Sequence, residues 1–412
     1  MERAALRARL EGPTAAVASE LRRQWRPVVA PTLVLWVIAT FVGGLYLKSF
    51  DIQEYERYAR VALHSPFLGH LPNEYPAPAL TVFLLPLLLP FAYPWAFAVF
   101  VGVVLVFLTT SFETSGVAGI DAEGAGRLIA YLALGEVMIL TTRFDIFAVA
   151  AAFWALRAAR QGRWSAAWTW SSVGFLLKLF PAALWPALLI AEWRRTGRVP
   201  LRRLYWMVGS MVAILALPAL FDRAALTTVF AYYTHRPPEI GSLASGLSLL
   251  DWHHWHAVAS FHSVNTTNSL ARTLAPLLQL AGVVAIAWVW WLQARDRLTL
   301  EATCLASLTL LVLTAKVGSV QYFMWLMPFW ALYRFRVTWL LACVVNTAVF
   351  PLAAWAGQFG HLTTHAYAVT LTMSYLARDV LVVIGTIGWF REVQGRPQDE
   401  RRLRSADPLP PG

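Results

Sequence analysis

Runs of apolar residues recur along nearly the whole chain, and each is about as long as a membrane-spanning helix or somewhat shorter. A helix needs about 20 mostly apolar residues to cross the hydrocarbon of a bilayer. Every backbone polar group must be bonded inside the chain there, so such runs are predicted to be helices and not open strands. Thirteen runs are found, at 28–48, 77–92, 94–112, 126–142, 144–159, 164–178, 180–193, 203–221, 273–293, 298–314, 318–334, 337–356 and 368–390. They predict an all-α, polytopic membrane protein.

Composition and charge agree with that class. Only 14% of the residues are charged, whereas a soluble domain has about 25%. The net charge of +11 would favour nucleic-acid binding in a soluble protein, but here the arginines gather at the two ends and in short connectors. That distribution is typical of cytoplasmic segments flanking membrane helices, so no nucleic-acid partner is expected. The connectors concerned are 157–163, 194–202, 294–297 and 334–336.

This charge distribution predicts an orientation. Both termini are expected in the cytoplasm, which requires an even number of crossings. About twelve crossings satisfy this if one of the three runs between residues 77 and 142 fails to span. Residues 1–27 then form a cytoplasmic segment, 28–390 the transmembrane domain, and 391–412 a disordered cytoplasmic tail. The first run is expected to act as an uncleaved anchor.

Two connectors on the predicted outer side are long, at 49–76 and 222–272. All nine histidines and all three lysines of the chain also fall on that side. Two interpretations remain open. The outer side has few polar residues, so each histidine or lysine there is conspicuous by itself; or the chemistry of the protein takes place on the outer face.

Asp51 follows the first apolar run directly. A helix starting there would place Asp51, Tyr55 and Tyr58 on one face. A carboxylate at the membrane edge is well placed to act as a general base. The alternative is that Asp51 only caps that helix.

Three further charged residues stand at the ends of apolar runs. Arg143 and Asp145 lie two positions apart, either as functional residues at a span boundary or as an interfacial ion pair with a helix cap. Lys178 is the sole charge in a long apolar stretch, and such a charge costs about 3 kcal/mol to insert. It needs an anionic partner, a lipid phosphate, or a route to water by snorkelling.

The second long loop has two polar clusters. His235 and Arg236 could together hold a phosphate, with the arginine as a bidentate donor, or they form a solvated turn before two prolines. The segment Asp251–His256 has three histidines and one aspartate, which could bind Zn²⁺. An interfacial aromatic belt or a sugar-stacking surface is the favoured alternative. Beyond the loop, Lys316, Gln321 and Tyr322 start another run and give only a weak signal alone.

Taken in order, these segments resemble the integral-membrane C-type glycosyltransferases, and specifically glycosyltransferase family 87. The resemblance covers residues 51–328, about two-thirds of the chain. The motifs that carry it are Asp51, Glu74-Tyr75-Pro76-Ala77-Pro78, Arg143-Phe144-Asp145, Leu177-Lys178-Leu179-Phe180-Pro181, Arg236-Pro237-Pro238-Glu239-Ile240-Gly241-Ser242 and Gln321-Tyr322-Phe323-Met324-Trp325-Leu326-Met327-Pro328. Ala77, Glu239 and Gly241 depart from the residues usual in that family.

The resemblance implies a C-type glycosyltransferase bundle and a sugar transfer with inversion on the outer face of the cell membrane. The donor would be a polyprenyl-phosphate sugar, mannose above all, and the acceptor a glycolipid or cell-envelope glycan. Asp51 would deprotonate the acceptor hydroxyl. The leaving phosphate needs cations, for which Arg236, Lys178 and His235 are the candidates, with Lys316 behind them. The other expected substrate-binding residues are Tyr55, Tyr75, Arg143, Asp145, Glu239, Gln321 and Tyr322.

A transporter or lipid flippase is the alternative function, and it would place charges in mid-membrane. Glu136 and the neighbouring Arg378 and Asp379 are the only candidates for that. A purely structural membrane component is a third possibility, which the long aromatic loops disfavour. The sequence indicates no certain cofactor; it does not support a divalent metal, and whether one is needed stays open.

Overall fold

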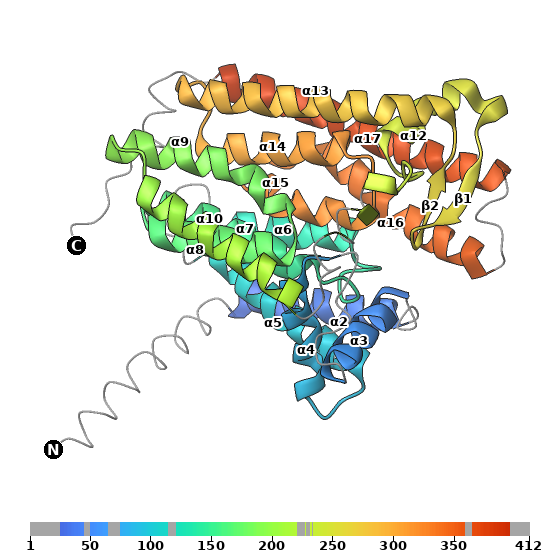
Figure 1. The fold of residues 1–412 in the computed structure, drawn as a ribbon, viewed down its shortest axis with the longest axis horizontal. Helices are drawn as coiled ribbons and strands as arrows, with labels where there is room; N and C mark the ends of the chain where they lie inside the picture. The colour runs from blue at the N-terminus through green and yellow to red at the C-terminus, as the bar shows by residue number, and fades with distance from the viewer. Residues whose placement is uncertain are drawn as a thin grey trace.

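The computed structural model describes residues 25–44, 50–64, 75–113, 121–220, 227, 231–232, 234–358 and 365–395. Most of these residues are helical (Figure 1). The predicted N-terminal segment and tail therefore lie largely outside the described residues, as do parts of both long loops. The last helix, however, continues to Gly395, past the expected start of the tail at 391.

The first half of the chain forms two groups of helices. The first comprises α2 (Ala30–Gly44), α3 (Phe50–Leu63), α4 (Leu80–Leu84) and α5 (Tyr93–Glu113). The second comprises α6 (Ala122–Gly135), α7 (Asp145–Arg160), α8 (Trp164–Leu177), α9 (Trp185–Thr196) and α10 (Leu201–Ala216). Short 3-10 segments flank α4, at Ala77–Ala79 and Leu85–Leu88, and another, Phe180–Leu184, precedes α9. Prolines stand at the starts of these 3-10 segments, where a missing N–H costs nothing.

The second half opens with the long loop, in which α12 (Leu243–Leu247) precedes the strands β1 (Ala257–Ser260) and β2 (Ser263–Thr266). The strands pair antiparallel, with Ala257 opposite Thr266. This hairpin adds a small sheet to the predicted all-α fold. The helices α13 (Ser269–Ala294), α14 (Leu300–Thr314), α15 (Met327–Trp330), α16 (Val337–Gln358) and α17 (His365–Gly395) follow. In Figure 1 the hairpin lies at one end of this group of helices.

Three helices of the described chain are long and apolar enough to cross a membrane: Tyr93–Phe112, Ser269–Ala294 and His365–Gly395. Further apolar helices are shorter, among them Pro27–Gly43 and Val337–Val349. On α13 the side chains of Leu280, Val283 and Val284 are more than 60% exposed. A row of exposed aliphatic side chains is suited to lipid and unusual in a water-soluble fold.

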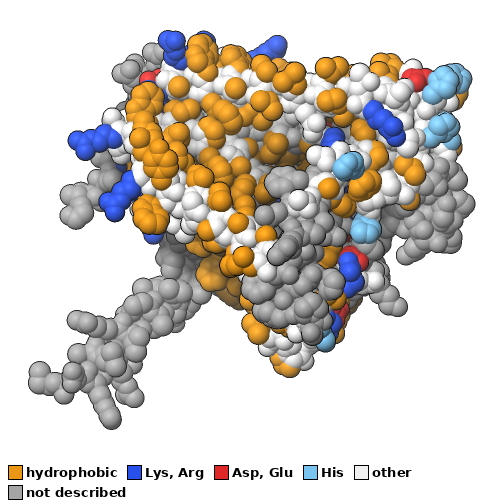
Figure 2. All heavy atoms as spheres, viewed as in Figure 1, with side chains coloured by type: hydrophobic (Ala, Val, Ile, Leu, Met, Phe, Trp, Pro, Cys, Tyr) orange, Lys and Arg blue, Asp and Glu red, His pale blue; other side chains and the backbone are white. Residues whose placement is uncertain are grey.

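Hydrophobic, histidine, and lysine or arginine side chains occupy different parts of the visible surface. In Figure 2 a broad hydrophobic surface occupies the visible face, and the histidines lie near the hairpin and near the lower lobe of the first helices. Lysines and arginines occur at both ends.

The core is built mainly around α7. The helix is buried on nearly every side, with alanine at many positions, so neighbouring helices pack closely against it. Its first residue, Asp145, is buried, and its last turn carries Arg157 and Arg160. The two ends of α7 therefore carry opposite charges, and the candidate site lies at the end that begins with Asp145.

Candidate functional site

The carboxylate of Asp51 forms an ion pair with the guanidinium of Arg143. Asp51 is in the first turn of α3, where the helix dipole favours a negative charge. Its side chain remains 22% exposed, whereas that of Arg143 is 12% exposed. The predicted helix beginning at Asp51 is confirmed, and Tyr55 and Tyr58 are buried beneath it. α3 begins at Phe50, which places Asp51 in its first turn, and residues 45–49 before it lie outside the described residues.

A cluster of aromatic rings lies next to this ion pair. Tyr55 stacks on Phe83 at 4.5 Å between centroids and meets Phe144 edge-on at 5.7 Å. Tyr75 also meets Phe144 edge-on, at 5.0 Å. Tyr55 lies outside the apolar spans, and burial raises the pKa of its hydroxyl well above the ordinary value. Its phenol is therefore a neutral hydrogen-bonding group beside Asp51.

A second ion pair lies on the other side of Phe144. The Lys178 Nζ is 2.7 Å from the Asp145 Oδ1, and the Trp325 Nε1 donates to the same oxygen at 2.7 Å. Lys178 directly follows the last residue of α8, where the dipole favours a cation. Rings of Phe144 and Tyr322 lie 5.0 and 5.6 Å from its ammonium. The anionic partner that the sequence required for Lys178 is thus Asp145.

The segment 143–145 therefore joins two acid–cation pairs. Arg143 contacts α3, while Asp145 contacts the end of α8 and the segment before α15. The alternative of an ion pair between Arg143 and Asp145 is not found among the described residues, where each forms its ion pair with a residue from a distant part of the chain. The cap expected of Asp145 is not made either: Asp145 is the first residue of α7, and Phe144 is the N-cap.

A second polar cluster is centred on Glu239. Its carboxylate accepts hydrogen bonds from the Ser263 hydroxyl at 2.5 Å and the Gly318 amide at 3.0 Å. Arg236 lies 3.5 Å from the same carboxylate. The Lys316 Nζ donates to the Thr234 carbonyl at 3.3 Å, beside Arg236. The expected residues Arg236, Glu239 and Lys316 are thus brought together where the second long loop meets the connector after α14.

Arg378 holds this junction from inside the fold. Its guanidinium donates to the Gly241 carbonyl at 3.0 Å, the Gly318 carbonyl at 3.3 Å and the Asn346 Oδ1 at 3.1 Å. It also pairs with Asp379, and both side chains are almost fully buried. Asn346 in turn donates to Glu136 at 3.4 Å. The sequence did not connect Arg378 with the candidate site. The signal that could have identified it is that a charged residue lies within an apolar run.

The backbones of Gly241 and Gly318 touch at this junction. A β-carbon at Gly241 would lie 2.5 Å from the Gly318 carbonyl oxygen. We predict that Gly241→Ala lowers the free energy of unfolding by about 3 kcal/mol, because a backbone must move. Gly126→Ala on α6 is the matched control, since nothing lies within 4 Å of its β-carbon. Thermal unfolding in detergent should show a lower midpoint for the first variant only; equal midpoints would contradict the close approach.

The remaining expected residues are placed less tightly. His235 is exposed, and its Nδ1 lies 2.8 Å from the Ala231 carbonyl. Gln321 and Tyr322 are half-buried in the 3-10 segment Val320–Trp325, with Tyr322 stacked on Trp325 at 4.1 Å. That segment follows Lys316 closely and ends at Trp325, so it connects the two polar clusters. Trp325 belonged to a quoted motif, but its bond to Asp145 was not predicted.

The histidine-rich segment forms a surface patch. His254 lies 2.8 Å from Asp251, and the rings of Trp252 and His253 are 3.9 Å apart. Hydrogen bonding to His254 lowers the pKa of Asp251. Among the described residues no group of three or more histidines, cysteines or carboxylates is arranged to hold a metal ion. Zn²⁺ coordination by this segment therefore has no geometric support among the described residues, and the aromatic-belt or sugar-stacking interpretation stays a prediction.

Comparison with known proteins adds no further constraint: no family model and no curated protein matches the chain.

Proposed function

We propose that the protein is a membrane glycosyltransferase that moves a sugar, mannose above all, from a polyprenyl-phosphate donor to a hydroxyl of a glycolipid or cell-envelope glycan. The observation that supports this best is the junction around Phe144. It joins a partly exposed carboxylate, two cations and several aromatic rings from distant parts of the chain. A base, a charged environment and stacking surfaces are what sugar transfer from a lipid phosphate requires.

The proposed roles follow from exposure and partners. Asp51, partly exposed, is the general base, and Arg143 fixes the direction of its carboxylate. Asp145 and Lys178 are buried against one another and position the Phe144 junction. The departing phosphate is assigned to Arg236 and Lys316, which stand side by side at the loop junction, with His235 at the surface beside them. Sugar stacking is assigned to Tyr75 and Tyr322.

The proposed topology has twelve crossings, with both termini in the cytoplasm and the site on the outer face. The non-spanning run is then 77–92. Of the three runs between residues 77 and 142 it has the shortest helical part: Ala77–Leu88 reaches only roughly 20 Å, whereas the helices of the other two are Tyr93–Glu113 and Ala122–Gly135. With that run excluded, Asp51, the loop 222–272 and the connector after α14 all come to the outer side.

A transporter is the competing proposal, and it depends on the charges within spans. Arg378 and Asp379 pair with each other, and Arg378 also holds two loop carbonyls. These contacts are suited to bracing the loops and less to carrying a substrate across. The transferase proposal therefore accounts for more of the polar residues.

Reconstituted protein distinguishes the two. Proteoliposomes with a short-chain polyprenyl-phosphate mannose and a glycolipid extract should form a mannosylated product and release polyprenyl phosphate. Movement of the donor between leaflets without a new glycosidic bond would reject the transferase proposal in favour of a flippase.

The pH dependence of donor binding tests the phosphate assignment. Lys316 lies in the connector outside the apolar spans, and burial followed by the nearby charge of Arg236 lowers its pKa. Donor affinity should therefore fall as pH rises toward 10.5, since binding needs the ammonium form. Lys316→Arg should retain affinity to higher pH, because a guanidinium stays protonated.

The pH dependence of stability has the opposite sign to that of donor affinity. A lysine with a lowered native pKa binds fewer protons when folded, so its contribution to stability increases with pH in the same window. Donor binding measured by tryptophan quenching, beside thermal unfolding at each pH, separates the two effects. Identical pH profiles for donor binding in wild type and Lys316→Arg would remove Lys316 from the phosphate site.

A further inference from the structure

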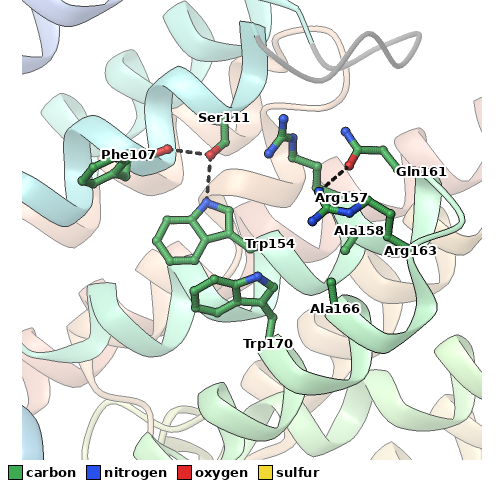
Figure 3. Close-up of a pocket in the computed structure, with 9 residues that line it drawn as sticks. All are labelled: Phe107, Ser111, Trp154, Arg157, Ala158, Gln161, Arg163, Ala166 and Trp170. Atoms are coloured by element: carbon green, nitrogen blue, oxygen red, sulfur yellow. Dashed lines mark hydrogen bonds between the residues drawn. The ribbon is translucent and has the colours of Figure 1, made fainter. Parts of the chain in front are cut away.

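A pocket of about 390 Å³ lies at the other end of α7 from the candidate site. Asp145 and Arg157 are separated by twelve positions on α7, or about 18 Å along its axis. Residues of α5, α7 and α8 and of the turn between α7 and α8 line it (Figure 3). The pocket is therefore a separate feature, on the face that the proposed topology places in the cytoplasm.

One side of the pocket is cationic. Arg157, in the last turn of α7, and Arg163, the N-cap of α8, both line it. The Arg163 Nη1 lies 3.5 Å from the Gln161 Oε1. No side chain caps the start of α8, where Ala166 also lines the pocket. The positive end of that helix dipole and the two guanidinium groups therefore favour an anion at the same place.

The other side is aromatic. Trp154 and Trp170 meet edge-on with centroids 4.7 Å apart, and the Trp154 Nε1 donates to the Ser111 hydroxyl at 2.8 Å. Figure 3 shows the two indole rings together on one side and the arginines on the other. Phe107 is 59% exposed and Trp170 is 38% exposed. The aromatic side therefore opens onto the hydrocarbon-facing surface.

We propose that this pocket binds an anionic phospholipid, with the headgroup phosphate at Arg157, Arg163 and the start of α8. The acyl chain lies against Phe107 and Trp170. Charge complementarity accounts for the phosphate, and the exposed apolar continuation favours a lipid over a soluble phosphate compound. Exposed Val103 on α5 and Val173 on α8 extend that apolar surface along the same two helices.

Titration of the purified full-length protein with phosphatidylglycerol, followed by native mass spectrometry, tests the proposal. We expect affinity to fall about tenfold or more in Arg157→Gln/Arg163→Gln, since each arginine near an anionic lipid contributes about 1 kcal/mol. Arg202→Gln, an exposed arginine on α10, is the matched control and should bind as wild type does. Arg163→Gln alone should show a smaller loss, and as an exposed position it avoids any folding defect.

Two further arms identify the source of the phosphate. Trp170→Ala should weaken phosphatidylglycerol binding, and glycerol phosphate should compete poorly with the lipid. Wild-type affinity in both arginine variants would overturn the proposal. So would glycerol phosphate binding as tightly as the lipid with no effect of Trp170→Ala, because the occupant would then be a soluble phosphate compound.

Discussion

Asp51→Asn should lower the rate of sugar transfer by about 10²–10⁴-fold while leaving the fold intact, because a general base contributes that much. The amide has the same shape as the carboxylate and can still accept a hydrogen bond from Arg143. It cannot take a proton from the acceptor hydroxyl. The loss should therefore appear in single-turnover transfer at saturating donor, with little change in donor affinity. Because Arg143 is 12% exposed and loses its counter-charge, the thermal midpoint should fall as well, so transfer is compared at a temperature where the variant is still folded.

The same helix provides a matched control. Glu54 is also on α3 and forms an ion pair with Arg57, whose side chain is 55% exposed. Glu54→Gln removes one carboxylate from the same element and should change stability by less than about 1 kcal/mol and transfer hardly at all. Full activity of Asp51→Asn would remove Asp51 from its role. Equal loss in both variants would instead indicate an effect of α3 charge in general.

Helix positions were predictable from the sequence where an apolar run is uninterrupted. The run 144–159 became α7, Asp145–Arg160, and the run 164–178 became α8, Trp164–Leu177. The length of an apolar run alone does not show whether it forms one continuous helix. The runs 77–92 and 318–334 are broken into 3-10 segments and the short helices α4 and α15. Pro78, Pro86 and Pro328 lie within the first turns of these short elements, so the prolines were the signal that apolar length concealed.

Partners of the charged residues were much less predictable. Arg143 and Asp145 are neighbours in sequence, yet each pairs with a residue from elsewhere. Side chains two apart at the start of a helix point in different directions, so sequence proximity was a poor guide. Arg378 had no visible relation to Gly241 and Gly318, because only the fold brings α17 against these two loops.

Lys178→Met should destabilise the protein more than any surface charge change, by about 3–5 kcal/mol, because it leaves a buried carboxylate without its cation. Asp145 is 1% exposed and Lys178 is 11% exposed, so water cannot easily replace the lost partner. The thermal midpoint in detergent should fall accordingly. As a control, Arg336 pairs with Glu392 in a more exposed setting, and Arg336→Met should have a much smaller effect.

The double variant Asp145→Asn/Lys178→Met separates a positioning pair from a phosphate ligand. The amide that replaces the Asp145 carboxylate can still accept the hydrogen bond of Trp325, and no buried charge remains, so most of the stability should return. If the pair only positions the Phe144 junction, sugar transfer should return with the fold. If Lys178 itself holds the departing phosphate, the double variant should be stable but remain slow, and the phosphate site would then include Lys178 beside Arg236 and Lys316. A double variant as unstable as Lys178→Met alone would show that the two charges do not act as a pair.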